Sequence, residues 1–193
     1  MKELLQIFKT NKGYISAKEL KSRTMRNHLQ KLIDKGEVSR LKWGVYCLNK
    51  EIPKRQMIDV ERIVPGGVIC LYSAWSHYQL SLSIPNAFHL AIEKSRKISL
   101  PNHPRIVLTY LKKEYYELGI EPVSIEGFNV KIYDIEKCVC DAVKYRNKVG
   151  MELTAEVLRN YLALRNRNID KLVKYAKAMR IYPTLKMYLE VQL

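Results

Sequence analysis

The sequence lacks the features that mark membrane and secreted proteins. It contains no run of about 18 apolar residues, the length that a membrane-spanning helix needs. Its opening stretch, MKELLQIFKTNKG, has neither the long apolar segment nor the small-residue cleavage site of a signal peptide. With 47% hydrophobic residues, the chain is rich enough in apolar side chains to bury a core. We therefore expect a globular cytoplasmic protein that has no membrane partner.

Cysteine and histidine are scarce, with four of each in 193 residues. Cys138 and Cys140 form a C-x-C pair without a second pair, which is a poor pattern for zinc. The histidines show neither H-x-x-x-H nor H-E-x-x-H spacing. We predict four reduced, buried thiols, no metal site and no cofactor.

Enzyme signatures are also missing, because no nucleophile elbow, P-loop or dinucleotide fingerprint is present. Glu93-Lys94 resembles the acidic-x-Lys core of nucleases only faintly. We expect no metal set from Asp134, Glu136 and Asp141, because Asp134 and Glu136 are too close in sequence to face together on a helix; Asp134 fits a helix N-cap instead. The prediction is a non-enzyme without catalytic residues. A nuclease is the rival hypothesis, and DNA cleavage that requires Mg²⁺ would reveal it.

Positive charge is abundant and lies at both ends of the chain, whose net charge is +15. Residues 1–56 hold 14 Lys/Arg and 5 Asp/Glu, a net charge of +9. Residues 57–141 hold 9 and 10, a net charge of −1, and residues 142–193 hold 11 and 4, a net charge of +7. Two separate basic blocks favour a nucleic-acid partner over a merely solvated basic surface.

The pattern of residues 1–50 predicts a winged helix-turn-helix. Residues 2–10 fit a first helix, and Ser16 with Glu19 forms a capping box for a short helix over residues 17–21. Residues 22–24 read as a turn, with Thr24 as the N-cap of a longer helix that ends at Lys35-Gly36. The apolar face of this helix is formed by Met25, Leu29, Leu32 and Ile33. Residues 38–41 and 45–48 are expected to form the two strands of a following hairpin.

The outward side chains of this longer helix suit the major groove of DNA, which is wide enough to admit a helix. Arginine pairs with guanine, and asparagine or glutamine with adenine. Residues at the helix start can hold a phosphate, and the hairpin would lie near the backbone or the minor groove. Trp43, between the strands, is expected to pack within the hairpin rather than to stack on a base. The predicted DNA-binding residues of this part are Ser22, Arg23, Thr24, Arg26, Asn27, Gln30, Lys31, Arg40 and Lys42.

Residues 51–56 are predicted as a linker and 57–193 as a second domain. A helix is expected to start at Ser73 or a neighbour, and FHLAIEK, RIVLTYL and PVSIEGFNVKIYD supply strands. Asp134 opens another helix, and from Glu152 the pattern is helical, with breaks at 166–168 and Pro183 that suggest a small bundle. The fold class is α+β: an N-terminal winged helix-turn-helix plus a mixed α/β C-terminal domain ending in a helical bundle.

The C-terminal block offers a possible second DNA-contacting surface. Lys171, Lys174 and Lys177 recur every three residues on one side of a predicted helix, where like charges repel. Such a stripe indicates either that a polyanion binds along it or that this face of the helix is exposed to solvent. The predicted DNA-binding residues of this block are Lys148, Arg159, Arg165, Arg167, Lys171, Lys174, Lys177 and Lys186.

Two groups of segments resemble a known family. GYISAKEL and LIDKGEVSRLKWGVYCL resemble the N-terminal winged helix of the antitoxins of AbiE-type abortive-infection systems. LYSAWSHYQLS, HLAI and VKIYDIEKCVCDAVKYRNKVGMELTAEVLRNYL resemble the second domain of that family, so the resemblance spans nearly the whole chain. It implies a bacterial antitoxin of a type IV toxin–antitoxin system that functions in phage defence.

The resemblance also implies partners. The winged helix would bind inverted repeats in the promoter of its own operon and repress it, and the C-terminal domain would supply antitoxicity. The cognate toxin would be a nucleotidyltransferase-like protein that is countered without a stable complex. We expect a monomer in solution that binds DNA cooperatively. The alternative is a winged-helix module for a protein or RNA partner without promoter binding.

Overall fold

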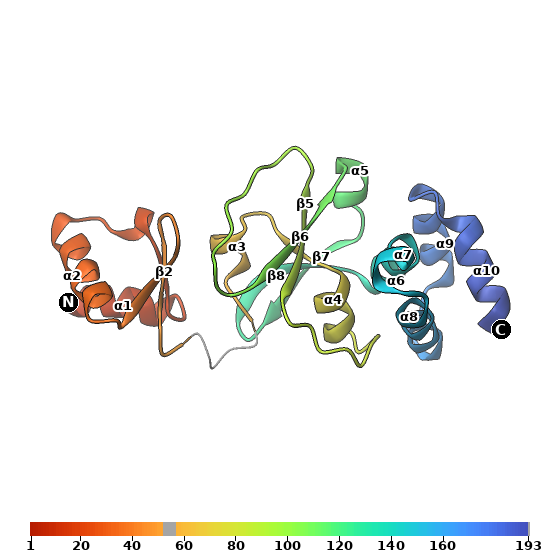
Figure 1. The fold of residues 1–193 in the computed structure, drawn as a ribbon, viewed down its shortest axis with the longest axis horizontal. Helices are drawn as coiled ribbons and strands as arrows, with labels where there is room; N and C mark the ends of the chain where they lie inside the picture. Colours follow the sequence, from red (N-terminus) through yellow and green to blue (C-terminus); the bar gives the residue numbers. More distant parts are fainter. Residues whose placement is uncertain (52–56, 193) are drawn as a thin grey trace. The chain divides into compact units, whose positions relative to one another are not determined.

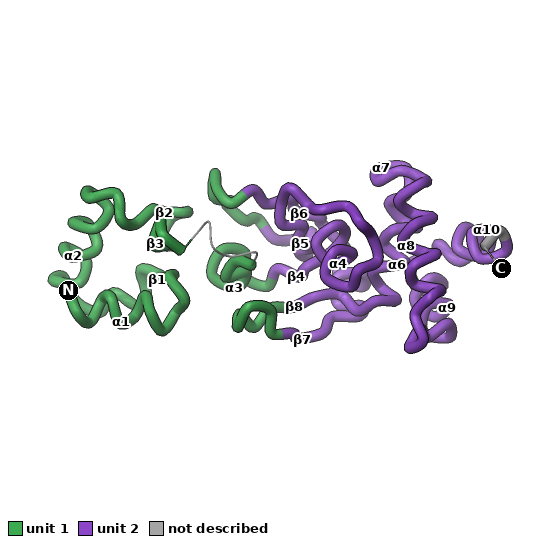
Figure 2. Tube along the Cα trace, turned by 90° about the horizontal axis from the view of Figure 1, so that it is seen from below, with its two compact units in different colours: residues 1–66, 97–104, 124–130 green, residues 67–96, 105–123, 131–193 purple. Residues whose placement is uncertain are grey.

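The computed structural model describes residues 1–51 and 57–192, which form a mixed α+β protein with two β-sheets (Figure 1). The chain divides into two compact units (Figure 2). The first contains residues 1–66, 97–104 and 124–130, and the second contains 67–96, 105–123 and 131–193. The predicted domain start at residue 57 therefore lies inside the first unit. The predicted linker, apart from Glu51, lies outside the described residues.

The N-terminal part of the first unit alternates helices with short strands. Its elements are α1 (Lys2–Thr10), β1 (Tyr14–Ser16), the 3₁₀ helix η1 (Ala17–Glu19), α2 (Arg23–Asp34), β2 (Val38–Lys42) and β3 (Val45–Leu48). Helix α3 (Val60–Ile63) follows residues 52–56. The predicted helix over residues 2–10, the longer helix and the hairpin are thereby confirmed.

A small apolar core holds these elements together. Leu4 and Phe8 of α1 are fully buried against Ile15 of β1 and against Leu29 and Leu32 of α2. The apolar residues of α2 recur at helical spacing, so one face of the helix enters this core and the opposite face meets solvent. The buried face fixes which side chains of α2 can reach a partner.

The first sheet has three strands in the order β1-β3-β2. β2 and β3 form the predicted antiparallel hairpin, with an irregularity in the register between Arg40 and Lys42. β1 pairs antiparallel with β3, from Tyr14 opposite Cys47 to Ser16 opposite Val45. This third strand ties the hairpin to the segment that precedes α2.

Two expectations about helix bounds need correction. The N-cap of α2 is Ser22, not Thr24, because the Ser22 hydroxyl accepts the N–H of Met25 at 3.2 Å. The short helix ends at Glu19, not near Lys21, and it is a 3₁₀ helix of three residues. Its predicted capping box is confirmed: the Ser16 N–H donates to Glu19 Oε2 at 2.7 Å.

The second sheet is mixed, with strand order β6-β5-β4-β8-β7. β4 pairs antiparallel with β5 and parallel with β8, and β5 pairs parallel with β6. The strands and their intervening helices are β4 (Val68–Ile69), α4 (Leu71–His77), β5 (Phe88–Glu93), β6 (Ile106–Leu111), α5 (Lys113–Tyr116), β7 (Ile120–Ile125) and β8 (Phe128–Tyr133). The predicted strands are confirmed, and the helix expected near Ser73 begins two residues earlier.

The C-terminal part is helical, as predicted. It comprises α6 (Ile135–Lys144), α7 (Arg146–Val149), α8 (Met151–Ala163), α9 (Ile169–Ala178) and α10 (Tyr182–Gln192). Asp134 is the N-cap of α6, accepting the Lys137 N–H at 2.8 Å. The break near residues 166–168 separates α8 from α9, whereas Pro183 lies in the first turn of α10, where proline is tolerated.

Helix α6 is the centre of the second unit and packs against α4, α8 and α9. Its residues from Glu136 to Val143 are all buried. They include a charged pair, since the Lys137 ammonium lies 2.6 Å from Asp141 Oδ1 and 4.2 Å from the centre of the Tyr133 ring. All four cysteines of the chain are buried thiols, as expected.

Within residues 1–51 and 57–192, no helix combines the length and the apolar character that crossing a membrane requires.

Candidate nucleic-acid interface

The solvent face of α2 carries the side chains that were predicted to contact DNA. Arg23, Arg26, Asn27 and Lys31 are exposed, as are the Ser22 cap and Thr24. Gln30 is exposed as well, but its amide donates to Asp34 Oδ1 at 2.8 Å on the same helix. The structure thus brings the predicted residues of α2 together on one face.

The start of α2 keeps only part of the phosphate-binding capacity expected of it. The Ser22 oxygen serves as the cap acceptor for the Met25 N–H. The hydroxyl hydrogen of Ser22 is still a donor, because a serine hydroxyl both donates and accepts. Thr24, no longer the cap, lies within the first turn and exposes its side chain.

The hairpin separates its two predicted basic residues. Arg40 is exposed, and its guanidinium lies 4.3 Å from the centre of the Trp43 ring. Lys42 instead donates to the carbonyl of Ile63 at 2.5 Å, and partial burial lowers its pKa. Arg40 is therefore presented to solvent, whereas Lys42 is engaged inside the first unit.

Trp43 contacts its own hairpin, as expected, but it is not packed into a core. Its side chain is 86% exposed, and its contact is the Arg40 guanidinium. The turn that carries it is anchored at the next residue, since the carbonyl of Gly44 accepts the N–H of Ala17 at 2.7 Å. Gly44 has φ +72°, a conformation that suits glycine, so the chain can turn directly after Trp43.

Lys171, the first lysine of the predicted C-terminal stripe, lies in a cluster of carboxylates. Its ammonium is 3.1 Å from Asp134 Oδ2 and 3.3 Å from Glu136 Oε2. Although burial acts to lower the pKa of Lys171, its contact with Asp134 outweighs this, and the pKa is raised. Tyr175 also donates to Asp134 Oδ2, at 2.9 Å. Lys171 is thus held by acidic partners of its own unit.

The same cluster corrects the expectation about Asp134 and Glu136. These residues do approach a common point, because Asp134 is the N-cap and its side chain is not constrained to the helical spacing of α6. The point where they meet is occupied by the Lys171 ammonium. No group of three or more His, Cys, Asp or Glu side chains that could hold a metal occurs in the described part of the chain.

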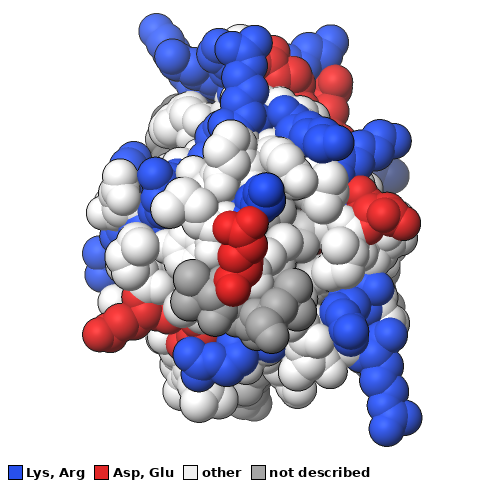
Figure 3. All heavy atoms as spheres, turned by 90° about the vertical axis from the view of Figure 1, so that its right-hand side faces the viewer, with Lys and Arg blue, Asp and Glu red and all other residues white. Residues whose placement is uncertain are grey.

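The other predicted C-terminal residues do not form one continuous stripe. Lys174 and Lys177 are exposed on α9, and the Lys177 ammonium lies 5.3 Å from the centre of the Tyr182 ring. Lys186 pairs with Glu190 at 3.5 Å. The remaining exposed residues are Lys148, Arg159, Arg165 and Arg167. Figure 3 shows Lys and Arg distributed around the rim of one face, with one basic group beside an acidic one near its centre.

The comparisons with known proteins add no relative. No protein-family model matches the chain, and a search of curated proteins finds no match. The candidate interface is therefore described by geometry alone: a helix with an exposed polar and basic face, followed by a hairpin that presents an arginine and a tryptophan.

Proposed function

We propose that residues 1–50 form a winged helix-turn-helix that binds double-stranded DNA, with α2 as the recognition helix and the β2–β3 hairpin as the wing. The observation that carries this proposal is the solvent-exposed surface of α2, to which Arg26 and Asn27 both contribute while Leu29 is buried in the core. Arginine and asparagine recognise guanine and adenine through paired hydrogen bonds in the major groove.

The order of elements supports the same assignment. α1, η1 and α2 are followed by the hairpin, and β1 adds a third strand that ties the hairpin to the segment preceding α2. The net charge of +9 on residues 1–56 would neutralise phosphates, which provides most of the salt-dependent affinity of DNA-binding proteins.

We further propose that the chain is the antitoxin of a type IV toxin–antitoxin system and represses its own operon. This part rests on the resemblance of the quoted segments to antitoxins of AbiE-type systems. The second unit would supply antitoxicity against a nucleotidyltransferase-like toxin. As part of the same proposal, the protein acts in the cytoplasm and has no enzymatic activity.

A gel-shift titration tests the DNA-binding proposal. Purified protein is titrated against duplex DNA from directly upstream of its own gene, with scrambled duplex as competitor, at two salt concentrations. We expect selective shifts that occur in steps and weaken as salt rises, because copies of the protein would occupy repeated sites. Equal binding to scrambled DNA, or none, would leave a protein or RNA partner as the better assignment.

Substitution of Arg26 tests the role of α2. Arg26→Ala should weaken binding to the promoter by about 1–3 kcal/mol, the usual contribution of a paired contact to a base. Arg26→Lys is the matched control, because it keeps the positive charge and removes the planar fork of donors. It should bind scrambled DNA like the parent and lose the preference for the promoter. Undiminished preference in both variants would contradict the assignment of α2 to the major groove.

A further inference from the structure

The second sheet has two edge strands, β6 and β7, and only one of them is protected. A sheet edge presents unpaired backbone groups that can pair with another chain, so proteins usually block it with charged residues or proline. β7 carries both, at Glu121 and Pro122. β6 reads IVLTYL and carries neither. Of these two edges, β6 is therefore the one suited to accept a further strand.

The hydrogen bonds to β5 show which backbone groups of β6 point outward. The Arg105 carbonyl accepts the Phe88 N–H at 2.9 Å, and the Leu111 carbonyl accepts the Lys94 N–H at 2.7 Å. Because alternate residues of a strand bond to the same neighbour, the odd-numbered residues from 105 to 111 face β5. The N–H and C=O groups of the open edge belong to Ile106, Leu108 and Tyr110. Within residues 1–51 and 57–192 the backbone of these three residues makes no hydrogen bond, and we call their N–H groups the outward amides.

The exposed side chains of β6 also suit an extended partner. Tyr110 is 50% exposed and Val107 is 36% exposed. They lie on opposite faces of the strand, because successive side chains alternate. Aromatic and β-branched residues stabilise cross-strand pairs, and tyrosine is frequent among the residues that dominate binding energy. A strand placed beside β6 would find a partner side chain on each face.

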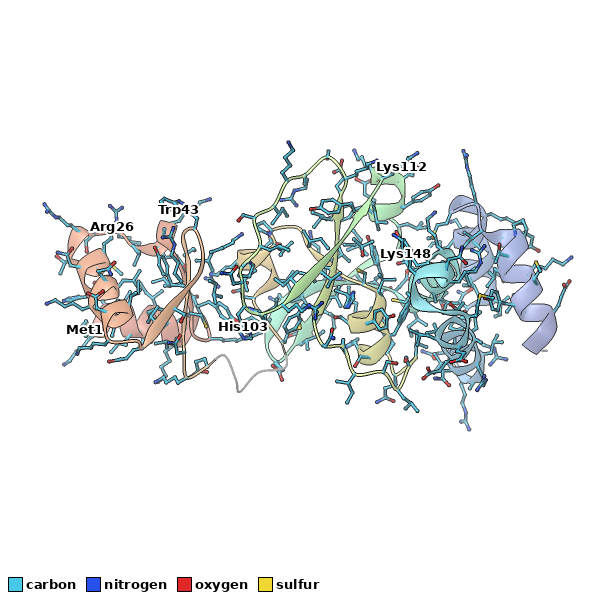
Figure 4. All side chains as sticks on the ribbon, in the orientation of Figure 1. Met1, Arg26, Trp43, His103, Lys112 and Lys148 are labelled. Atoms are coloured by element: carbon cyan, nitrogen blue, oxygen red, sulfur yellow. The ribbon has the colours of Figure 1, made fainter. Side chains whose placement is uncertain are left out.

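Positive charge borders β6 at both ends. Arg105 directly precedes the strand, and Lys112 follows it where the chain enters α5 (Figure 4). Both are exposed, and neither forms an ion pair in the described part of the chain. A second copy of β6 would place Arg105 near Lys112 in an antiparallel pair and near Arg105 in a parallel one, and like charges opposite each other are destabilising. The ends of β6 therefore disfavour a second copy and favour a strand with carboxylates at its ends.

We infer that the open edge of β6 binds an extended segment of a partner protein that is apolar in its middle and acidic at both ends, and that this segment adds a sixth strand to the five-stranded sheet. Backbone hydrogen bonds to the edge provide the affinity of such a contact, and side chains provide its specificity. The net charge of +15 also attracts an acidic partner. The inference goes beyond DNA binding and does not depend on it.

Synthetic peptides test the preference for acidic ends. A glutamate peptide alternates valine and threonine and carries two glutamates at each end, and a lysine peptide replaces the glutamates by lysines. Each is titrated against the full chain and followed by fluorescence anisotropy of a dye on the peptide. The glutamate peptide should bind at least about tenfold more tightly, and the difference should shrink as salt rises. A third peptide keeps the glutamates and has prolines in its middle, so it cannot form the ladder and should not bind.

Hydrogen exchange of the full chain, followed residue by residue, locates the bound peptide. In the free protein, the outward amides should exchange faster than the amides of β6 that bond to β5. The glutamate peptide should slow exchange at the outward amides at least about tenfold, because each alternate residue of β6 gains a hydrogen bond.

Charge reversal connects the preference to the ends of β6. Arg105→Glu with Lys112→Glu should reverse it, so that the lysine peptide binds more tightly than the glutamate peptide. Lys174→Glu with Lys177→Glu is the matched control, because it changes the net charge equally at two exposed residues of α9. The control should still prefer the glutamate peptide.

Replacement of Tyr110 separates the backbone contact from the side chain. Tyr110→Pro removes one outward amide that the sheet does not use, whereas Tyr110→Thr keeps the amide and removes the ring. Tyr110→Pro should bind the glutamate peptide about tenfold more weakly than Tyr110→Thr. Equal circular dichroism of the two variants shows that both are folded.

Three outcomes would overturn the inference. The first is a proline-containing peptide that binds as tightly as the glutamate peptide. The second is a bound glutamate peptide that leaves the exchange of the outward amides unchanged. The third is protection of these amides in the protein alone that grows with protein concentration, which would assign the edge to a second copy. Because none of these measurements uses the promoter, failure here would leave the DNA-binding proposal standing.

Discussion

At the scale of single residues, Lys171 differs from Lys174, the next lysine on α9, because it contacts two carboxylates. Its ammonium lies 3.1 Å from Asp134 and 3.3 Å from Glu136, whose side chains are only 5% and 8% exposed. Removing one partner of a buried pair leaves a charge without compensation. Because the Lys171 side chain is itself 32% exposed, solvent screening reduces the effect. We expect Lys171→Ala to lower the free energy of unfolding by about 2 kcal/mol, measured in urea.

Lys174→Ala is the control for this prediction, because Lys174 is exposed on the same helix. Its effect on the free energy of unfolding should stay within about 0.5 kcal/mol, as for most surface substitutions. Equal effects of the two substitutions would mean that the carboxylate cluster contributes little to stability.

The pH dependence of the Lys171 contact follows from the direction of its pKa shift. Its pKa is raised in the folded protein, mainly by Asp134 acting against burial. The contribution is therefore complete below the pKa of lysine in the unfolded chain, about 10.4, and is lost as pH rises through the higher folded value. As the pH rises above 9, the free energy of unfolding should fall more steeply for the parent than for Lys171→Ala. Parallel curves measured in denaturant would contradict this assignment.

Residue-level predictions from the sequence mostly succeed where the cause is local; the exception is the N-cap of α2, where two candidate caps, Ser22 and Thr24, lie close together. The capping box of Ser16 and Glu19 and the cap at Asp134 depend on residues three positions apart, so the spacing alone indicates them. The surroundings of Lys171 and Trp43 depend on packing. Asp134 lies 37 positions before Lys171, and no local pattern in the sequence indicates that Trp43 is exposed.

At the scale of elements, Glu19 links η1 to its surroundings in the first unit. It accepts the Ser16 N–H at 2.7 Å and the Asn11 amide at 2.6 Å, and it pairs with Arg62 at 2.9 Å. Burial acts to raise the pKa of Glu19, but the hydrogen bonds from Ser16 and the Arg62 guanidinium outweigh it, so the pKa is lowered. A carboxylate at this place fixes the segment that leads into α2.

Glu19→Gln should therefore lower the free energy of unfolding at pH 7 by about 1 kcal/mol, since the amide cannot accept all of these bonds. A lowered folded pKa means that the contribution is present above the unfolded value and is lost as pH falls through the folded value. Denaturant unfolding between pH 7 and pH 3 should show a steeper loss for the parent than for the variant. Glu37→Gln, at an exposed site, is the control, and a loss as large as that of Glu19→Gln would count against this role.

Elements whose apolar residues recur with a clear period were predicted correctly. For elements buried on all sides, the sequence pattern did not predict which residues face inward. The apolar period of α2 predicted which face it buries, because only one side of that helix meets the core. α6 is buried from Glu136 to Val143, so its pattern could not reveal that charged residues also face inward. β1 has three residues, too few for alternation to predict that it joins the hairpin as a third strand.

At the scale of the whole molecule, only some of the basic side chains are free of acidic partners and exposed to a binding partner. The basic ends were visible in the sequence as blocks of +9 and +7. Side-chain contacts then divide the lysines into two groups. Lys171 and Lys186 have acidic partners, whereas Lys174 and Lys177 are exposed one turn apart on α9. The number of basic residues in the C-terminal block thus overstates the charge that can meet phosphates.

A comparison of two double variants tests whether α9 contacts DNA. Lys174→Gln with Lys177→Gln removes two exposed charges from α9. Lys97→Gln with Lys113→Gln is the control, because it lowers the net charge equally at two exposed lysines outside the predicted DNA-binding residues. Each lost phosphate contact lowers the slope of log affinity against log salt by about one unit. The α9 variant should therefore lose up to about two units of slope on the promoter duplex, and the control much less. Equal slopes in both variants would mean that α9 is a solvated face and that only net charge matters.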